Sequence, residues 1–224
     1  MDFLEKNWKN LAFGLVVLLV VGLGYSIYST QSSEKEKKAQ AAFANIEQQV
    51  LALKAATAPG ADKAADQKAA PVDKEKLKQD LEGFVSQFPG TVASQMASLA
   101  LADIYSTESK NSEALAVLKK TANNSGVLSN TLVIKRMGQI LSDMDQCAEA
   151  VQVWEKVVSN KQASFAHGDV KIQQALCYKK MNDLKKAEEL LTSVKNNKTE
   201  GQEQLSQEAD RILRLLKLNS TLGS

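Results

Sequence analysis

Apolar residues are concentrated in one uninterrupted run near the start of the chain. The eighteen residues from Leu11 to Tyr28 carry no charge. At about 1.5 Å per residue, a helix of this length spans about 27 Å, close to the thickness of the hydrocarbon core of a bilayer. Trp8 before the run and Tyr25 near its end suit the two interfaces, where aromatic rings prefer to sit. The run therefore predicts a transmembrane helix at residues 11–28.

Two other interpretations of this run stay open. A cleavable signal peptide has a shorter apolar region and a site of small residues, of which Gly24 and Ser26 make only a poor example. A helix buried in a protein core is the remaining interpretation. No cysteine follows the run directly, so a lipid-modified amino terminus is not expected.

Lysines flank the run on both sides. Lys6 and Lys9 precede it, and Lys35, Lys37 and Lys38 follow it, so the positive-inside rule is nearly balanced. Long domains cross a membrane largely regardless of charge, which weakens the rule for the segment after the run. We expect the short amino-terminal tail in the cytoplasm and the larger domain outside it.

Beyond the run, apolar residues recur every three or four positions, which is the spacing of amphipathic helices. Helices are predicted over residues 32–55, 73–88, 92–109, 112–123, 130–143, 147–159, 168–181, 183–194 and 202–218. Strand-like alternation is absent, so the predicted fold class is all-α. The segment from Ala56 to Val72 has no large apolar side chain before Val72, and we interpret it as a flexible insertion.

A repeated spacing of small and large residues links the helices in pairs. A small residue is followed by a larger one after three positions, by a second small one after nine more and by a large one after four more. The copies are Ala102-Tyr105-Ala114-Leu118, Gly138-Leu141-Ala150-Trp154 and Ala175-Tyr178-Ala187-Leu191. Small residues let two helices approach and large ones fill the adjacent groove, so such pairs stack around a shared core.

This pattern resembles the tetratricopeptide repeat from Val92 to Val194. The first-helix motif is matched by Ser98-Leu101-Ala102-Tyr105, Ile134-Met137-Gly138-Leu141 and Lys171-Gln174-Ala175-Tyr178, although Thr121, Val157 and Val194 depart from a small position of the family. The resemblance implies an α-solenoid behind the transmembrane helix. It also implies a degenerate preceding pair before Val92 and a capping helix at residues 202–218.

Taken whole, the chain resembles a bacterial family of single-span inner-membrane proteins, the YfgM-like ancillary subunits of the SecYEG translocon. The resemblance lies in this architecture and in the stretch from Phe88 to Asp103. It implies a cytoplasmic amino terminus and a periplasmic domain that contacts chaperones or clients. The alternative is a cytoplasm-facing tetratricopeptide adaptor that recruits soluble proteins to a membrane.

These expectations divide the chain into six parts. They are a short tail (1–10), a transmembrane helix (11–28), a membrane-proximal helix (32–55), a flexible insertion (56–72), tetratricopeptide-like repeats (73–199) and a capping helix (200–218).

Binding is a better explanation of the composition than catalysis. The formal net charge of +2 gives no reason to expect nucleic acid, and the sequence has no catalytic or phosphate-binding motif. His167, the single histidine, is interpreted as a helix cap or a surface residue, and no metal, cofactor or small-molecule substrate is predicted. The geometry of the resembled family implies a protein-binding concave face made by Met96, Leu99, Asp103, Lys135, Gln139, Ile172, Leu176 and Lys179.

The two cysteines have two interpretations. In a reducing compartment Cys147 and Cys177 are ordinary small buried residues. In the repeat register, Cys147 begins a second helix and Cys177 lies near the end of the next first helix, and these ends are neighbours in an antiparallel stack. This placement allows the two cysteines to form a disulfide in an oxidising compartment such as the periplasm.

Overall fold

The structure, a computed structural model, is helical throughout the part that it describes. It describes the backbone of residues 2–57, 72–122, 126–197 and 201–222, and the side chains of 15–23, 25–26, 29–56, 72–122, 126–197 and 201–218. The elements are α1 (Asp2–Thr57), α2 (Lys74–Gln87), α3 (Val92–Thr107), α4 (Asn111–Thr121), α5 (Val127–Asp143), α6 (Cys147–Val158), η2 (Lys161–Ala163), α7 (Ser164–Lys180), α8 (Leu184–Lys195) and α9 (Glu203–Leu222). The predicted all-α class is confirmed, whereas residues 58–71 of the predicted insertion lie outside the described residues.

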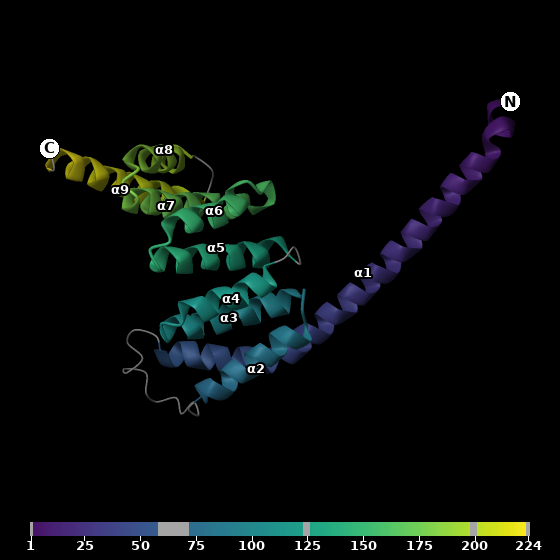
Figure 1. Ribbon diagram of the computed structural model, residues 1–224, viewed down its shortest axis with the longest axis horizontal. Coiled ribbons are helices and arrows are strands. Elements are labelled where there is room, and N and C mark those ends of the chain that lie inside the picture. The colour runs from purple at the N-terminus through teal and green to yellow at the C-terminus, as the bar shows by residue number, and fades with distance from the viewer. Residues whose placement is uncertain (1, 58–71, 123–125, 198–200, 223–224) are drawn as a thin grey trace.

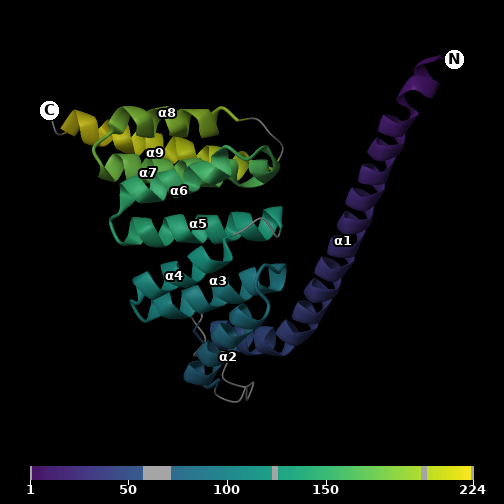
Figure 2. The same ribbon diagram turned by 45° about the vertical axis from the view of Figure 1, so that its right-hand side comes forward.

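The first helix differs from the two helices predicted for it. Residues 11–28 and 32–55 belong to one continuous α1, so the membrane-proximal helix continues the first one without a break between residues 28 and 32. The carboxyl-terminal half of α1 buries Ala39, Phe43 and Val50 against α2 and α3. Its amino-terminal half projects away from the other helices as a single rod (Figure 1; Figure 2).

Most of the described side chains in the projecting half of α1 are apolar, and they are exposed. Leu15, Leu18 and Leu23 are 60%, 73% and 64% exposed. No helix formed by the described residues combines the length and hydropathy of a membrane span. Of the run from Leu11 to Tyr28, the side chains of residues 11–14, 24, 27 and 28 lie outside the described residues. The predicted span is thus not confirmed.

A carboxylate from α1 holds the start of α3. Glu36 accepts hydrogen bonds from the backbone N–H of Val92 at 2.8 Å and of Ala93 at 3.3 Å. Thr91 is the N-cap of α3 and accepts from Ser94 N–H at 3.1 Å. The first N–H groups of a helix have no partner within the helix, so a carboxylate there both satisfies them and complements the helix dipole. This contact fixes α1 against the repeats.

Helices α3 to α8 form antiparallel pairs that stack side by side (Figure 2), with α3 and α4, α5 and α6, and α7 and α8 as the pairs. The same tight turn closes each pair, with Ser109, Asp145 and Asn182 at φ values of 60°, 59° and 62°. The next residue in each turn donates its N–H to a carbonyl five positions earlier, as Lys110 does to Tyr105 at 2.8 Å. From 109 to 145 is 36 positions and from 145 to 182 is 37, so the turn repeats with the predicted period.

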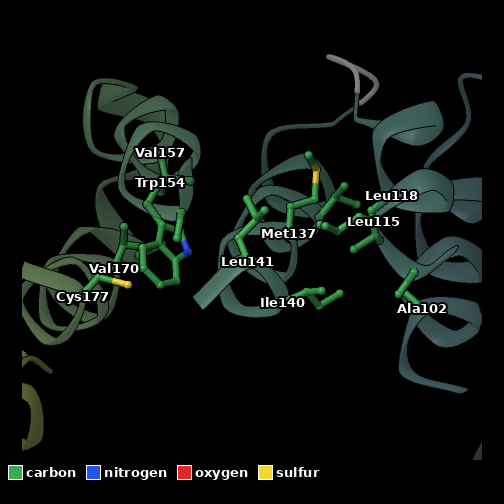
Figure 3. Close-up of a cluster of buried hydrophobic side chains, with 14 of the residues drawn as sticks. Ala102, Leu115, Leu118, Met137, Ile140, Leu141, Trp154, Val157, Val170 and Cys177 are labelled. Carbon is green, nitrogen blue, oxygen red and sulfur yellow. The ribbon is translucent and has the colours of Figure 1, made fainter. Parts of the chain in front are cut away.

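The predicted pattern of small and large residues forms the interior. Ala102, Ala114 and Leu118 are fully buried, and so are their counterparts Ala150, Ala187 and Leu191. In the middle pair, a Cβ atom at Gly138 would overlap the indole ring of Trp154. Trp154 Nε1 donates to the Lys135 carbonyl at 3.1 Å, and the ring lies beside Val157 and Val170 (Figure 3). Because Gly138 of α5 has no side chain, α6 can carry a tryptophan at position 154.

A buried polar layer, which the sequence did not predict, joins α3, α4 and α5. Gln95 is fully buried and donates from Nε2 to the Thr121 carbonyl at 3.0 Å, while Ser129 Oγ donates to Gln95 Oε1. Thr121 Oγ1 donates to Ser98 Oγ at 2.7 Å. Buried polar groups are costly unless they are paired, so these bonds fix how α3 sits relative to α5. The layer also explains why threonine replaces a small residue at position 121.

Two helix starts were predicted too late. Helix α5 begins at Val127 instead of residue 130, and α7 begins at Ser164 instead of residue 168. His167 therefore lies inside the first turn of α7 and is not its N-cap, which is Ala163. The imidazole Nε2 is 3.0 Å from the Asn160 carbonyl and ties α7 to the loop before it.

Candidate functional site: a groove across the first helices

A groove of ≈ 440 Å³ crosses the face formed by α1, α3, α5 and α7. Its lining residues come from these four helices and from α6 at its floor. They are Lys54, Leu99, Asp103, Leu132, Lys135, Arg136, Gln139, Trp154, Asp169, Val170 and Gln173. Because the first helices of the stacked pairs lie side by side, one residue from each helix can contribute to the same surface.

Ion pairs connect each helix of the groove to the next. Asp103 of α3 is 3.4 Å from Lys54 Nζ of α1 and 3.0 Å from Arg136 Nε of α5. Lys135 of α5 pairs with Asp169 of α7. These pairs are partly exposed, so each adds little stability by itself. Their effect is to place alternating charges along the groove.

The floor of the groove is apolar. Trp154 and Val170 are almost completely buried beneath it, and Leu99 and Leu132 are half-buried at its surface. Binding sites commonly combine an apolar floor with a few polar groups that fix the orientation of a ligand. The groove therefore offers both contact area and directional contacts to a polypeptide.

The structure brings together four of the eight predicted binding residues. Leu99, Asp103, Lys135 and Gln139 line the groove. Met96 and Leu176 are half-buried and pack against neighbouring apolar clusters, and Lys179 is exposed beyond the lining residues. Ile172 is only 1% exposed, because α9 packs against that side of α7 as the next first helix of a solenoid would. Ile172 therefore does not belong to the exposed binding face.

The prediction missed Lys54, Leu132, Arg136, Asp169 and Gln173. Helical periodicity could have found Leu132 and Arg136, since they lie within one turn of Lys135 and Gln139. The same argument finds Asp169 and Gln173, which are the counterparts of Leu132 and Arg136 displaced by 37 positions. Lys54 could not have been found in this way because it comes from α1, outside the repeated pattern.

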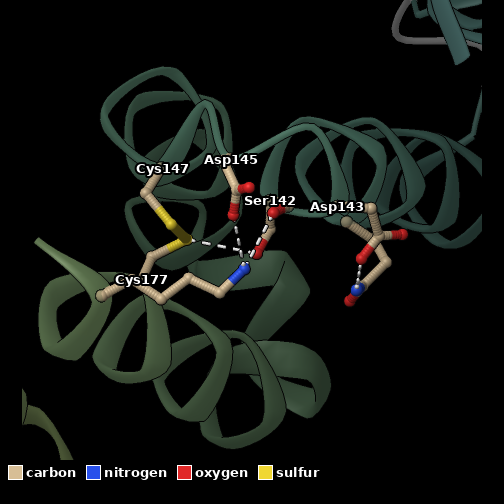
Figure 4. The surroundings of a disulfide bond; sticks show 7 residues. Ser142, Asp143, Asp145, Cys147 and Cys177 are labelled. Atoms are coloured by element: carbon tan, nitrogen blue, oxygen red, sulfur yellow. Dashed lines mark hydrogen bonds and ion pairs between the residues drawn. A yellow bond between two sulfur atoms is a disulfide. The ribbon is translucent and has the colours of Figure 1, made fainter.

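A disulfide joins the middle pair of helices to the last pair. Cys147 at the start of α6 is bonded to Cys177 near the end of α7, with Cα atoms 5.1 Å apart (Figure 4). Both residues are buried. Next to the bridge, Lys180 Nζ donates to the Ser142 carbonyl at 3.1 Å and to Asp145 at 3.3 Å. The two helix ends that the repeat register placed together are thus linked covalently.

Stacked helix pairs and a groove on the first helices define a helical-repeat domain of the kind that binds other proteins. No cluster of histidine, cysteine or acidic side chains suited to a metal occurs among the described residues. The chain belongs to the tetratricopeptide repeat-like family, because the model of the tetratricopeptide repeat-like domain matches residues 1–174. Neither a curated protein nor a solved structure matches the chain.

The matched range differs from the range in which the repeat was predicted. It includes the whole of α1 and ends within α7, whereas the predicted repeats covered residues 73–199, with the clear repeat pattern running from Val92 to Val194. The helix that carries the apolar run is therefore part of the family pattern. This agrees with the burial of Phe43 and Val50 of α1 against α2 and α3.

Proposed function

We propose that the chain is a membrane-anchored scaffold that binds other proteins in the groove across α1, α3, α5 and α7, whose lining includes Lys54 and Gln173. The observation that carries the proposal is the groove itself, since four helices of a tetratricopeptide repeat-like domain contribute to one surface with an apolar floor and a charged rim. Such surfaces take up extended segments or single helices of a partner.

Anchoring at a membrane is supported by the projecting half of α1. The run from Leu11 to Tyr28 has no charge, and the described side chains within it are left uncovered by the rest of the described chain. Leucine and valine in a long uncovered stretch are unfavourable in water and favourable in lipid. Tethering raises the local concentration of the groove near membrane-bound partners, so individual contacts can stay weak.

A location of the repeats outside the cytoplasm is supported by the disulfide between Cys147 and Cys177. Disulfides persist in oxidising compartments and are rare in the cytosol. We propose that the amino terminus lies in the cytoplasm and the repeats in the periplasm, at a bacterial inner membrane. The partners that we propose from the family resemblance are the SecYEG translocon and periplasmic chaperones or clients.

Membrane attachment can be tested by extracting membranes with alkaline carbonate. The full chain should stay in the membrane pellet, and a variant without residues 1–31 should leave it. A full chain that appears in the soluble fraction would contradict the anchor. A reporter enzyme fused at Ser224 then distinguishes the two sides, because activity only inside the cytoplasm would favour the adaptor that recruits soluble proteins.

Groove binding can be tested by photo-crosslinking in intact membranes. A photoreactive amino acid at Gln139, inside the groove, should give covalent adducts to other proteins. The matched control is the same substitution at Gln152, which is exposed on α6 and does not line the groove. Adducts of equal yield from both positions, or none from Gln139, would contradict a binding groove. Adducts that contain a translocon subunit would support the proposed partner.

A further inference from the structure

The groove carries an excess of positive charge. Its described lining residues include three cations, Lys54, Lys135 and Arg136, and two carboxylates, Asp103 and Asp169. Asp103 is shared between two of the cations, at 3.4 Å from Lys54 Nζ and 3.0 Å from Arg136 Nε. Asp103 thus contacts both cations, and the described lining residues carry three positive side chains and two negative ones, a charge balance that suits a ligand with a negative group.

The cations at the centre can be reached from solvent. The side chains of Lys135 and Arg136 are 31% and 28% exposed. A guanidinium has five N–H donors in a planar arrangement, and Asp103 approaches it at Nε. The two terminal nitrogens of Arg136 are thus the donors with which a ligand carboxylate would form a bidentate pair.

Apolar side chains adjoin these cations. Leu99 and Leu132 are half-buried on the first helices α3 and α5, each one turn before the charged residue of its helix, Asp103 and Arg136 respectively. A ligand that fills this surface must bring both a negative group and an apolar group. A polypeptide segment supplies the two most simply as an acidic residue near a leucine or a similar side chain.

We propose that the groove recognises an internal acidic and apolar segment of a partner protein, with side-chain carboxylates bound at Arg136 and Lys135. This inference rests on the proposed function, in which the groove binds proteins. Asp103 then acts as a competitor that occupies Arg136 and Lys54 while the groove is empty. Among the described lining residues there is no asparagine to hold the backbone of a chain terminus, so the free carboxyl end of a partner is not required.

Three capped peptides test the charge preference. Each has twelve residues with an acetylated amino end, an amidated carboxyl end and two leucines, and the peptides differ only in carrying glutamate, glutamine or lysine at four positions. Binding to the full-length chain in non-ionic detergent is measured by fluorescence anisotropy, with empty micelles as the blank. We expect the glutamate peptide to bind about fivefold more tightly than the glutamine peptide, and the difference to shrink at high salt.

Two substitutions with opposite expected effects separate recognition from a loss of structure. Arg136→Gln should weaken binding of the glutamate peptide about fivefold, whereas Asp103→Asn removes the competitor and should strengthen it about threefold. Lys119→Gln is the matched control, because Lys119 is exposed on α4 and does not line the groove. Simple destabilisation of the domain would weaken binding in both groove variants.

Equal binding of the three peptides, preference for the lysine peptide or weaker binding after Asp103→Asn would overturn the charge preference. If Gln139 still forms crosslinks to proteins in any of these cases, the binding groove stands and only its preference for acidic segments is wrong. If Gln139 forms no crosslinks either, the groove function and the preference fail together.

Discussion

Trp154 occupies the space that a side chain on Gly138 would need, and its indole N–H donates to the Lys135 carbonyl one turn earlier on α5 at 3.1 Å. The first and third helix pairs fill the corresponding positions with Ala102 and Leu118, and with Ala175 and Leu191. Compared with the other two pairs, the middle pair lacks a methyl group at position 138 of α5 and has a larger side chain, an indole ring, at position 154 of α6. Since Lys135 also lines the groove, this exchange supports the binding surface from beneath.

Gly138→Ala should destabilise the domain because the new methyl group overlaps the indole. Overpacking of this kind costs about 1–3 kcal/mol, which outweighs the gain of about 0.5–1 kcal/mol that alanine gives over glycine in a helix. The measurement is the free energy of unfolding from denaturant titration followed by circular dichroism. Gly83→Ala on α2 is the control, because a Cβ there meets nothing within 4 Å.

Adding Trp154→Leu to Gly138→Ala should restore much of the lost stability, since the double variant has the residues of the other two pairs. A double-mutant cycle should give a favourable coupling of about 1 kcal/mol or more between the two positions. Additive effects of the two substitutions would show that the indole does not limit the size of residue 138.

Replacing Cys147 and Cys177 by alanine should lower the free energy of unfolding by about 2–4 kcal/mol, because the bridge closes a loop between residues 30 positions apart. The measurement is denaturant unfolding of the double variant and of the natural chain with and without reductant. Reductant should destabilise the natural chain and leave the double variant unchanged. If reductant affects both proteins equally, the stabilisation does not come from this bridge.

Glu108 should make the stability of the domain depend on pH in the acid range. Hydrogen bonds from Lys110, Lys74 and Lys78 lower the pKa of Glu108 from 4.5 to about 2. The unfolded chain therefore binds the proton more readily, so the contribution is complete above about pH 4.5 and is lost as pH falls towards about 2. Glu108→Gln should flatten the stability profile in this window. Glu149→Gln, an exposed change on α6, is the control.

Ser109→Gly should stabilise the domain by up to about 1 kcal/mol. Ser109 has a φ of 60° in the turn between α3 and α4, a conformation that is unfavourable for a residue with a Cβ atom. Ser193→Gly, in the regular helix α8, should instead lower stability by about 0.5 kcal/mol. Opposite signs in thermal unfolding would confirm the turn geometry, and a loss of stability in both variants would contradict it.

Much of the stack could be predicted because its interior depends on residue size at fixed helical spacing. Ala114, Ala150 and Ala187 are fully buried, as the small positions of the repeat require. Asp73 caps α2 by accepting from Lys76 N–H at 3.1 Å, and Pro89 and Gly90 follow the end of that helix at Gln87. These features are local, so a short stretch of sequence determines them.

The groove was predicted less well because its members depend on contacts between distant segments. Ile172 matches the repeat position of Lys135, but α9 covers it, and the repeat spacing does not show which helix will lie there. The pairing of Gln95 with the Thr121 carbonyl joins residues 26 positions apart. Lys54 of α1 looks like ordinary helix surface until its position beside Asp103 of α3 is known.

The continuity of α1 has a mechanical consequence. Residues 28 and 54 lie on one unbroken helix, which changes direction between its projecting half and the half that packs against α2 and α3 (Figure 1; Figure 2). The same helix contributes Lys54 to the groove. Any change in the orientation of its first turns is therefore transmitted along α1 to the place where a partner would be held.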